Sequence, residues 1–123
     1  MILECYKLLK MIEKRPAMYV GEATLNNIKI FVSGYYAALL ENNIISESLN
    51  EPFFDWTAQK LGFYESTAGW ANMILAYSLG INPKTVIWED VFALQITKEQ
   101  HLDSIKLFYE LIEEYKNEIS KEK

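Results

Sequence analysis

The spacing of apolar residues is the feature that most constrains how this chain can fold. After Thr97, large apolar side chains recur every three or four positions, which is the period of one face of an α-helix. These residues are Leu102, Ile105, Phe108, Ile112, Tyr115 and Ile119. Thr97 and Gln100 have the spacing of a capping box, in which each side chain accepts a hydrogen bond from the other's backbone N–H. The pattern predicts a long amphipathic helix over 97–119.

The same helical period recurs through most of the chain. Prolines punctuate it, because a proline ring blocks the preceding helical turn but suits the first turn of a new helix. Further helices are expected over 2–14 (ended by Pro16), 24–42 (N-cap Thr24), 52–61 (closed by Gly62), the stretch from Ser66 or Thr67 to Leu79, and 84–95 after Asn82-Pro83. The segment 84–96 also fits a short strand at Thr85-Val86-Ile87-Trp88. The sequence therefore predicts an all-α fold, with five or six helices in a single compact domain over 1–123.

Charge is distributed unevenly along the 123 residues, whose formal net charge is −5. Residues 1–29 hold five basic and three acidic residues, whereas 30–123 hold seven basic and fourteen acidic ones. Between Lys29 and Lys84 the only basic residue is Lys60, and that stretch carries ten of the seventeen aromatic residues. An acidic chain of this kind repels phosphate backbones, so no nucleic-acid partner is expected.

The same composition bears on the compartment and on catalysis. A lone cysteine, Cys5, cannot form an internal disulfide, which points to a reducing compartment. The sequence lacks a secretory signal and any stretch of about 20 apolar residues, so we expect a cytoplasmic protein with no membrane contact. Cys5 and His101 are single members of their kinds, which argues against a Cys/His metal cluster. Neighbouring carboxylates such as Glu89 and Asp90 diverge on a helix, so neither a cofactor nor an enzyme activity is expected.

The run from Lys14 to Gly21 is the most distinctive short segment. It resembles the Arg-Pro-Gly-Met-Tyr-Ile-Gly segment of the DNA gyrase B subunit, but the chain has no Gly-rich loop and no Asp followed by a glycine pair, which that ATP site requires. A structural interpretation is that Pro16 stops the first helix, Gly21 allows a positive φ, and Met18 and Tyr19 fold back onto the core. Arg15 would then cap carbonyls or pair with an acid. The alternative is that Arg15 and Tyr19 are presented to a partner.

The order of several blocks resembles a family of small bacterial immunity proteins of toxin systems, such as those of contact-dependent growth inhibition. The matching blocks are Arg15–Gly21, Gly34-Tyr35, the run Gly69-Trp70-Ala71-Asn72-Met73-Ile74 and Phe108–Ile112. Their motif residues are Arg15, Pro16, Met18, Tyr19, Gly21, Gly69, Trp70 and Asn72. Ala17 replaces the glycine usual in this pattern. The resemblance implies that the chain neutralises a toxin domain.

The aromatic middle of the chain is the predicted partner surface. Aromatic anchors ringed by acids suit a basic protein partner, because aromatics dominate binding hot spots and charge speeds encounter. The candidate residues are Glu47, Glu51, Asp55, Trp56, Tyr64 and Glu65. The alternative is that the nearby aromatics all belong to the core. In function, we expect a non-catalytic inhibitor of a toxin domain such as a basic nuclease; the alternative is a self-associating helical adaptor, which would form a homodimer.

Overall fold

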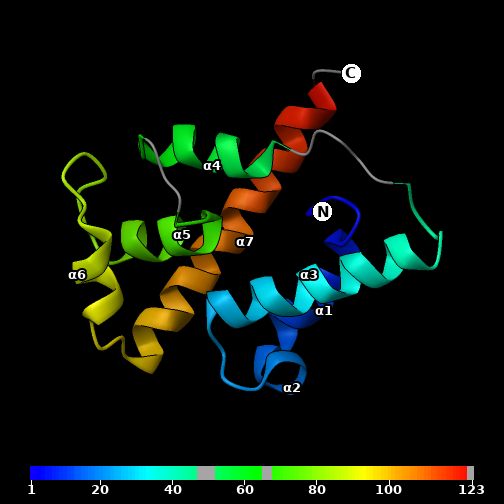
Figure 1. Ribbon diagram of the computed structural model, residues 1–123, viewed down its shortest axis with the longest axis horizontal. Coiled ribbons are helices and arrows are strands. Elements are labelled where there is room, and N and C mark those ends of the chain that lie inside the picture. Colours follow the sequence, from blue (N-terminus) through cyan, green and yellow to red (C-terminus); the bar gives the residue numbers. More distant parts are fainter. Residues whose placement is uncertain (47–51, 65–67, 122–123) are drawn as a thin grey trace. The chain divides into compact units, whose positions relative to one another are not determined.

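A computed structural model describes residues 1–46, 52–64 and 68–121, and these residues contain seven helices and no strand (Figure 1). The helices are α1 (Tyr6–Lys14), α2 (Pro16–Val20), α3 (Leu25–Glu41), α4 (Phe53–Leu61), α5 (Trp70–Ser78), α6 (Trp88–Ala93) and α7 (Lys98–Lys121). The all-α prediction is confirmed. One helix more than expected is present because Pro16 ends α1 and also starts the short helix α2, at whose first position proline is favourable.

Contacts divide the chain into two compact units, Met1–Glu51 and Pro52–Lys123. The single domain expected from the sequence stays a prediction. Among the described residues, no helix is both long enough and apolar enough to cross a membrane.

The first unit consists of α1, α2 and α3, with α2 in contact with both of the others. The predicted cap of α3 is confirmed, since the Thr24 hydroxyl accepts from the Asn27 backbone N–H at 3.1 Å. The Asn27 side chain in turn donates to the Glu22 carbonyl at 2.9 Å and to the Val20 carbonyl at 3.5 Å. Gly21 has φ +76°, as predicted, and this conformation lets the chain reverse between α2 and α3.

The second unit is built around α5, which packs against both α4 and α7. Figure 1 shows these two shorter helices beside the long α7. Phe53 of α4 lies in the centre of an aromatic cluster, with ring centroids 5.4 Å from Trp70, 6.2 Å from Phe108 and 5.1 Å from Tyr115. Trp70 stacks on Phe108 with centroids 5.0 Å apart and planes 11° apart. The cluster therefore joins all three helices of this unit's core.

Local signals predicted several helix ends correctly. The capping box is confirmed, because Gln100 Oε1 accepts from the Thr97 N–H at 2.9 Å and Thr97 Oγ1 accepts from the Gln100 N–H at 3.1 Å. Gly62 closes α4 in the left-handed conformation, with φ +85°.

Three predicted helix starts were wrong. Helix α1 begins at Tyr6 and not at residue 2. Helix α5 begins after Gly69, whose φ of +90° is accessible to glycine, and the expected caps Ser66 and Thr67 lie outside the described residues. Helix α6 begins at Trp88 and not at residue 84, because Asn82 Oδ1 accepts from the Lys84 N–H at 3.0 Å and holds this stretch in a turn.

We predict that Phe108→Ala lowers the free energy of unfolding by about 3–5 kcal/mol, because it leaves a cavity in the aromatic cluster. Leu102→Ala, on the same helix but 42% exposed, is the control and should cost about 1 kcal/mol or less. Urea denaturation followed by circular dichroism measures both. Equal losses in the two variants would contradict a core centred on these rings.

Candidate functional site

Trp56, a predicted partner anchor, takes part in packing within the second unit. Its ring is half-buried and lies 6.0 Å from Phe53 and 5.3 Å from Tyr115, centroid to centroid. Its indole N–H donates a hydrogen bond to the carboxylate of Glu118. The contacts hold Trp56 against α7 and leave only part of the ring exposed.

The charges beside Trp56 also face one another. Lys60 Nζ lies 2.8 Å from Glu114 Oε2 and 5.9 Å from the centroid of the Trp56 ring. The hydrogen bond to Glu114, together with the attraction of the same carboxylate, raises the pKa of Lys60 above its ordinary value. The single basic residue of the middle segment is therefore engaged by α7.

The remaining predicted partner residues separate into two groups. Asp55 is exposed on α4, and Tyr64, three residues beyond the helix, is 83% exposed. Glu47, Glu51 and Glu65 lie outside the described residues. Of the other aromatics in this segment, Phe53 and Phe63 are buried, whereas Phe54 is 37% exposed. The expectation that all of them belong to the core is therefore wrong for Phe54 and Tyr64.

A stack of aromatic rings leads from the buried Phe63 to the surface at α6. Phe63 stacks on Trp88 with centroids 5.5 Å apart, and Trp88 stacks on Phe92 with centroids 6.0 Å apart. Phe63 is 6% exposed and Phe92 is 60% exposed. Tyr64 directly follows Phe63 in the sequence, and its ring is 83% exposed. We define the α6 surface as the exposed side chains of Tyr64, Ile87, Glu89, Asp90, Phe92 and Leu94.

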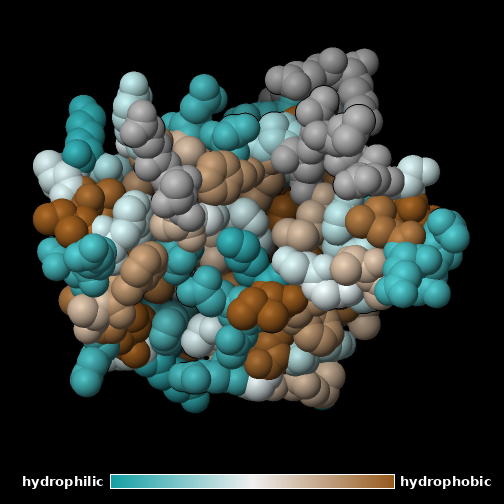
Figure 2. Space-filling model, viewed as in Figure 1, coloured by the Kyte–Doolittle hydropathy of each residue, from teal (hydrophilic) through white to brown (hydrophobic). Residues whose placement is uncertain are grey.

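The α6 surface combines apolar and acidic groups. A hollow of about 290 Å³ is lined by Ile87, Asp90 and Leu94, among others, and none of the stacked rings belongs to its lining. Ile87 is 60% exposed and Leu94 is 50% exposed. Figure 2 shows hydrophobic residues reaching the surface over α6. Glu89 and Asp90 are exposed in the first turn of α6, where the helix dipole favours negative charge.

Sequence reasoning missed Ile87, Phe92 and Leu94. The signal that could have found Phe92 was its spacing of four from Trp88, which places both rings on one side of a helix. Exposure of Phe92 could not be read from this spacing, because an apolar pair on a helix is usually part of a core.

The side chains of the N-terminal motif, Arg15–Gly21, pack only partly as the structural interpretation predicted. Tyr19 is half-buried and makes an edge contact with Phe31 at 6.3 Å, but Met18 is 64% exposed, so the prediction that Met18 folds back onto the core is wrong. Pro16 and Gly21 have their predicted roles. Arg15 is exposed and forms no ion pair with any residue of the described ranges, so the predicted pairing with an acid is not found there.

The central motif, by contrast, serves packing. Gly69 is the N-cap of α5, and Trp70 is buried against Phe108. The side-chain amide of Asn72 donates to the Ala68 carbonyl at 2.8 Å, which ties the first turn of α5 to the chain before it.

The single cysteine and the single histidine belong to different units. Cys5 is buried in the first unit. His101 is half-buried in the first turn of α7, and its Nδ1 has no hydrogen-bond partner within the described part of the chain. No group of three or more His, Cys, Asp or Glu side chains among these residues could hold a metal ion.

No protein-family model, curated protein or solved structure matches this chain.

We predict that Trp56→Ala lowers the free energy of unfolding by about 1–3 kcal/mol, because two aromatic contacts are lost. Trp56→Phe, which keeps a ring and removes the indole N–H, should retain most of that stability. Chemical denaturation of both variants is the measurement. An unchanged stability in Trp56→Ala would show that the ring is free for a partner.

Proposed function

We propose that this chain is a non-catalytic inhibitory binding protein, an immunity protein that neutralises a bacterial toxin domain by direct binding. The observation that carries the proposal is the α6 surface, where Phe92 is the exposed end of a packed aromatic stack and Tyr64 is exposed next to its buried member, Phe63, in the sequence. Exposed rings anchored on a rigid base lose little conformational entropy on binding, which is the property of interface hot spots. The block order that resembles immunity proteins supports the same function.

The charge of the second unit supports a basic partner. Residues 52–123 hold seven basic and eleven acidic residues, and Glu89, Asp90 and Asp55 are exposed among its acids. Opposite charge on the partner would accelerate association and orient the encounter, while burial of the apolar side chains would supply most of the affinity. A toxin domain with a cationic active site, such as a nuclease, fits these requirements.

The proposed mechanism needs no chemistry from this chain. An acidic protein seated over a cationic active site excludes the anionic substrate by steric and electrostatic means. We propose that this binding takes place in the cytoplasm and requires no cofactor. Glu47, Glu51 and Glu65, which lie outside the described residues, stay predictions from the sequence.

The test is protection of cells that express the toxin-domain reading frame adjacent to this gene. We predict that Phe92→Ala with Tyr64→Ala weakens binding of the purified toxin domain by about tenfold or more and reduces growth protection. The matched control is Tyr77→Ala, since Tyr77 is 46% exposed on α5, outside the α6 surface, and should leave binding unchanged. Full protection by the double variant would remove the α6 surface from the proposal, and no protection by the unaltered chain would overturn the function.

A second variant pair tests the acidic groups. We predict that Glu89→Lys with Asp90→Lys slows association with the toxin domain and weakens the salt dependence of its rate, because charge at the interface steers encounter. Glu99→Lys with Asp103→Lys, exposed on α7, carries the same change of net charge and is the control. Circular dichroism verifies that α6 variants stay folded. Equal association rates in the two double variants would contradict a local role for Glu89 and Asp90.

A further inference from the structure

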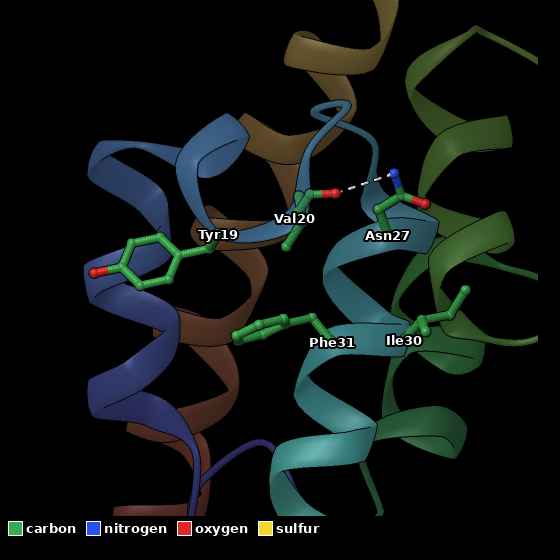
Figure 3. Close-up of a pocket in the computed structure, with 5 residues that line it drawn as sticks. All are labelled: Tyr19, Val20, Asn27, Ile30 and Phe31. Carbon is green, nitrogen blue, oxygen red and sulfur yellow. Dashed lines mark hydrogen bonds between the residues drawn. The ribbon is translucent and has the colours of Figure 1, made fainter.

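The first unit carries a second apolar surface, of opposite charge, around Tyr19. Two hollows share Tyr19 as a lining residue: one of about 280 Å³ also involves Ile30 and Phe31, and one of about 290 Å³ also involves Met11 and Met18. We call the two together the Tyr19 surface. Figure 3 shows the rings of Tyr19 and Phe31 extending to the same side, with Ile30 projecting from another side of α3.

The apolar side chains of the Tyr19 surface are open to solvent. Ile30 is 70% exposed, Met18 is 64% exposed and Met11 is 48% exposed. Figure 2 shows hydrophobic residues at the surface over the first half of α3. Methionine is unbranched and polarisable, so exposed methionines adapt their shape to apolar groups of a partner.

The backbone that presents these side chains is held without a ligand. Asn27 binds the Val20 and Glu22 carbonyls, and Thr24 caps the following helix, so the end of α2 is fixed to the start of α3. Gly21 supplies the turn between them at φ +76°. A surface whose backbone is already ordered loses less entropy when it binds a partner.

The basic residues beside one of the hollows indicate the charge of the partner. Lys14 and Arg15 line the hollow that contains Met11 and Met18, and neither forms an ion pair with another residue of the described ranges. The sequence around them, 1–29, is the one basic part of an acidic chain. Arginine and lysine beside an apolar hollow favour carboxylates next to an apolar anchor.

We propose that the Tyr19 surface is a docking site for an acidic polypeptide segment with apolar anchors, distinct from the basic partner proposed for the α6 surface. The anchors enter the two hollows beside Tyr19, and carboxylates of the same segment pair with Lys14 and Arg15. Because all residues of this site belong to the first unit, the proposal can be tested independently of the proposed inhibitory function.

The probe is a fluorescein-labelled amphipathic peptide of about 15 residues, with Leu and Phe at helical i, i+4 and i+7 anchors and Glu at the polar positions. Its counterpart carries Lys in place of every Glu. Fluorescence anisotropy with the full chain should show binding of the acidic peptide at least about tenfold tighter than of the basic one, with a loss of affinity as salt is raised. Equal affinity for both peptides would overturn the proposal.

Variants locate the binding site. Lys14→Glu with Arg15→Glu, and separately Met18→Asp, should each weaken binding of the acidic peptide by about tenfold or more. Lys98→Glu with Lys106→Glu, exposed on α7, carries the same change of net charge and should leave the affinity within about twofold. All three chains are compared at equal helicity by circular dichroism. Unchanged affinity for the acidic peptide in both variants of the Tyr19 surface would overturn the proposal.

Two other ligands could cover the Tyr19 surface, a second copy of the chain or an anionic lipid surface, and separate measurements test for each. Light scattering across dilution detects a second copy of the chain, and flotation with vesicles of phosphatidylcholine and phosphatidylserine detects an anionic lipid surface. Self-association or vesicle binding that Met18→Asp abolishes, without binding of the acidic peptide, would assign the surface to that occupant and overturn the proposal. The proposal is supported if the chain is monomeric, does not bind the vesicles and binds the acidic peptide.

Discussion

The contacts of Phe53 hold the second unit together. Its ring meets Trp70 from α5 and Phe108 and Tyr115 from α7, so one residue of α4 touches both of the other core helices. A helix as short as α4 is unstable by itself in water, and tertiary packing of this kind stabilises it. Since α4 is fixed by Phe53, the chain beyond Gly62 leaves in a defined direction, and the ring of Phe63 can stack on Trp88.

The packing of the second unit determines which of its aromatic residues are available to a partner. Phe92 is the exposed end of a stack whose inner member, Phe63, is buried, whereas Trp56 is held against α7 by its contact with Tyr115 and by Glu118. The acids beside Phe92 favour a basic partner, and the bases beside Tyr19 in the first unit favour an acidic one. The uneven charge of the chain thus corresponds to two proposed surfaces with different partners.

Features that depend on neighbouring residues alone could be predicted from the sequence. The capping box of α7, the Thr24 cap and the closing Gly62 each involve groups a few residues apart. Features that depend on distant packing could not. The burial of Trp56 depends on α7, which lies far along the chain, and the exposure of Phe92 depends on which side of α6 the rest of the unit covers. The helix over 52–61 was therefore predicted correctly, whereas the packing of Trp56 against Tyr115 was not predicted.

Hydrogen–deuterium exchange of the chain, free and bound to its purified toxin domain, tests the central claim most directly. The short helix α6 has few turns to protect its amides, so exchange over 87–94 should be fast in the free chain. The account predicts that binding slows exchange over 87–94 and around Tyr64, with little change on the exposed face of α7. Slowed exchange confined to other parts of the second unit, with 87–94 unchanged in the complex, would contradict it.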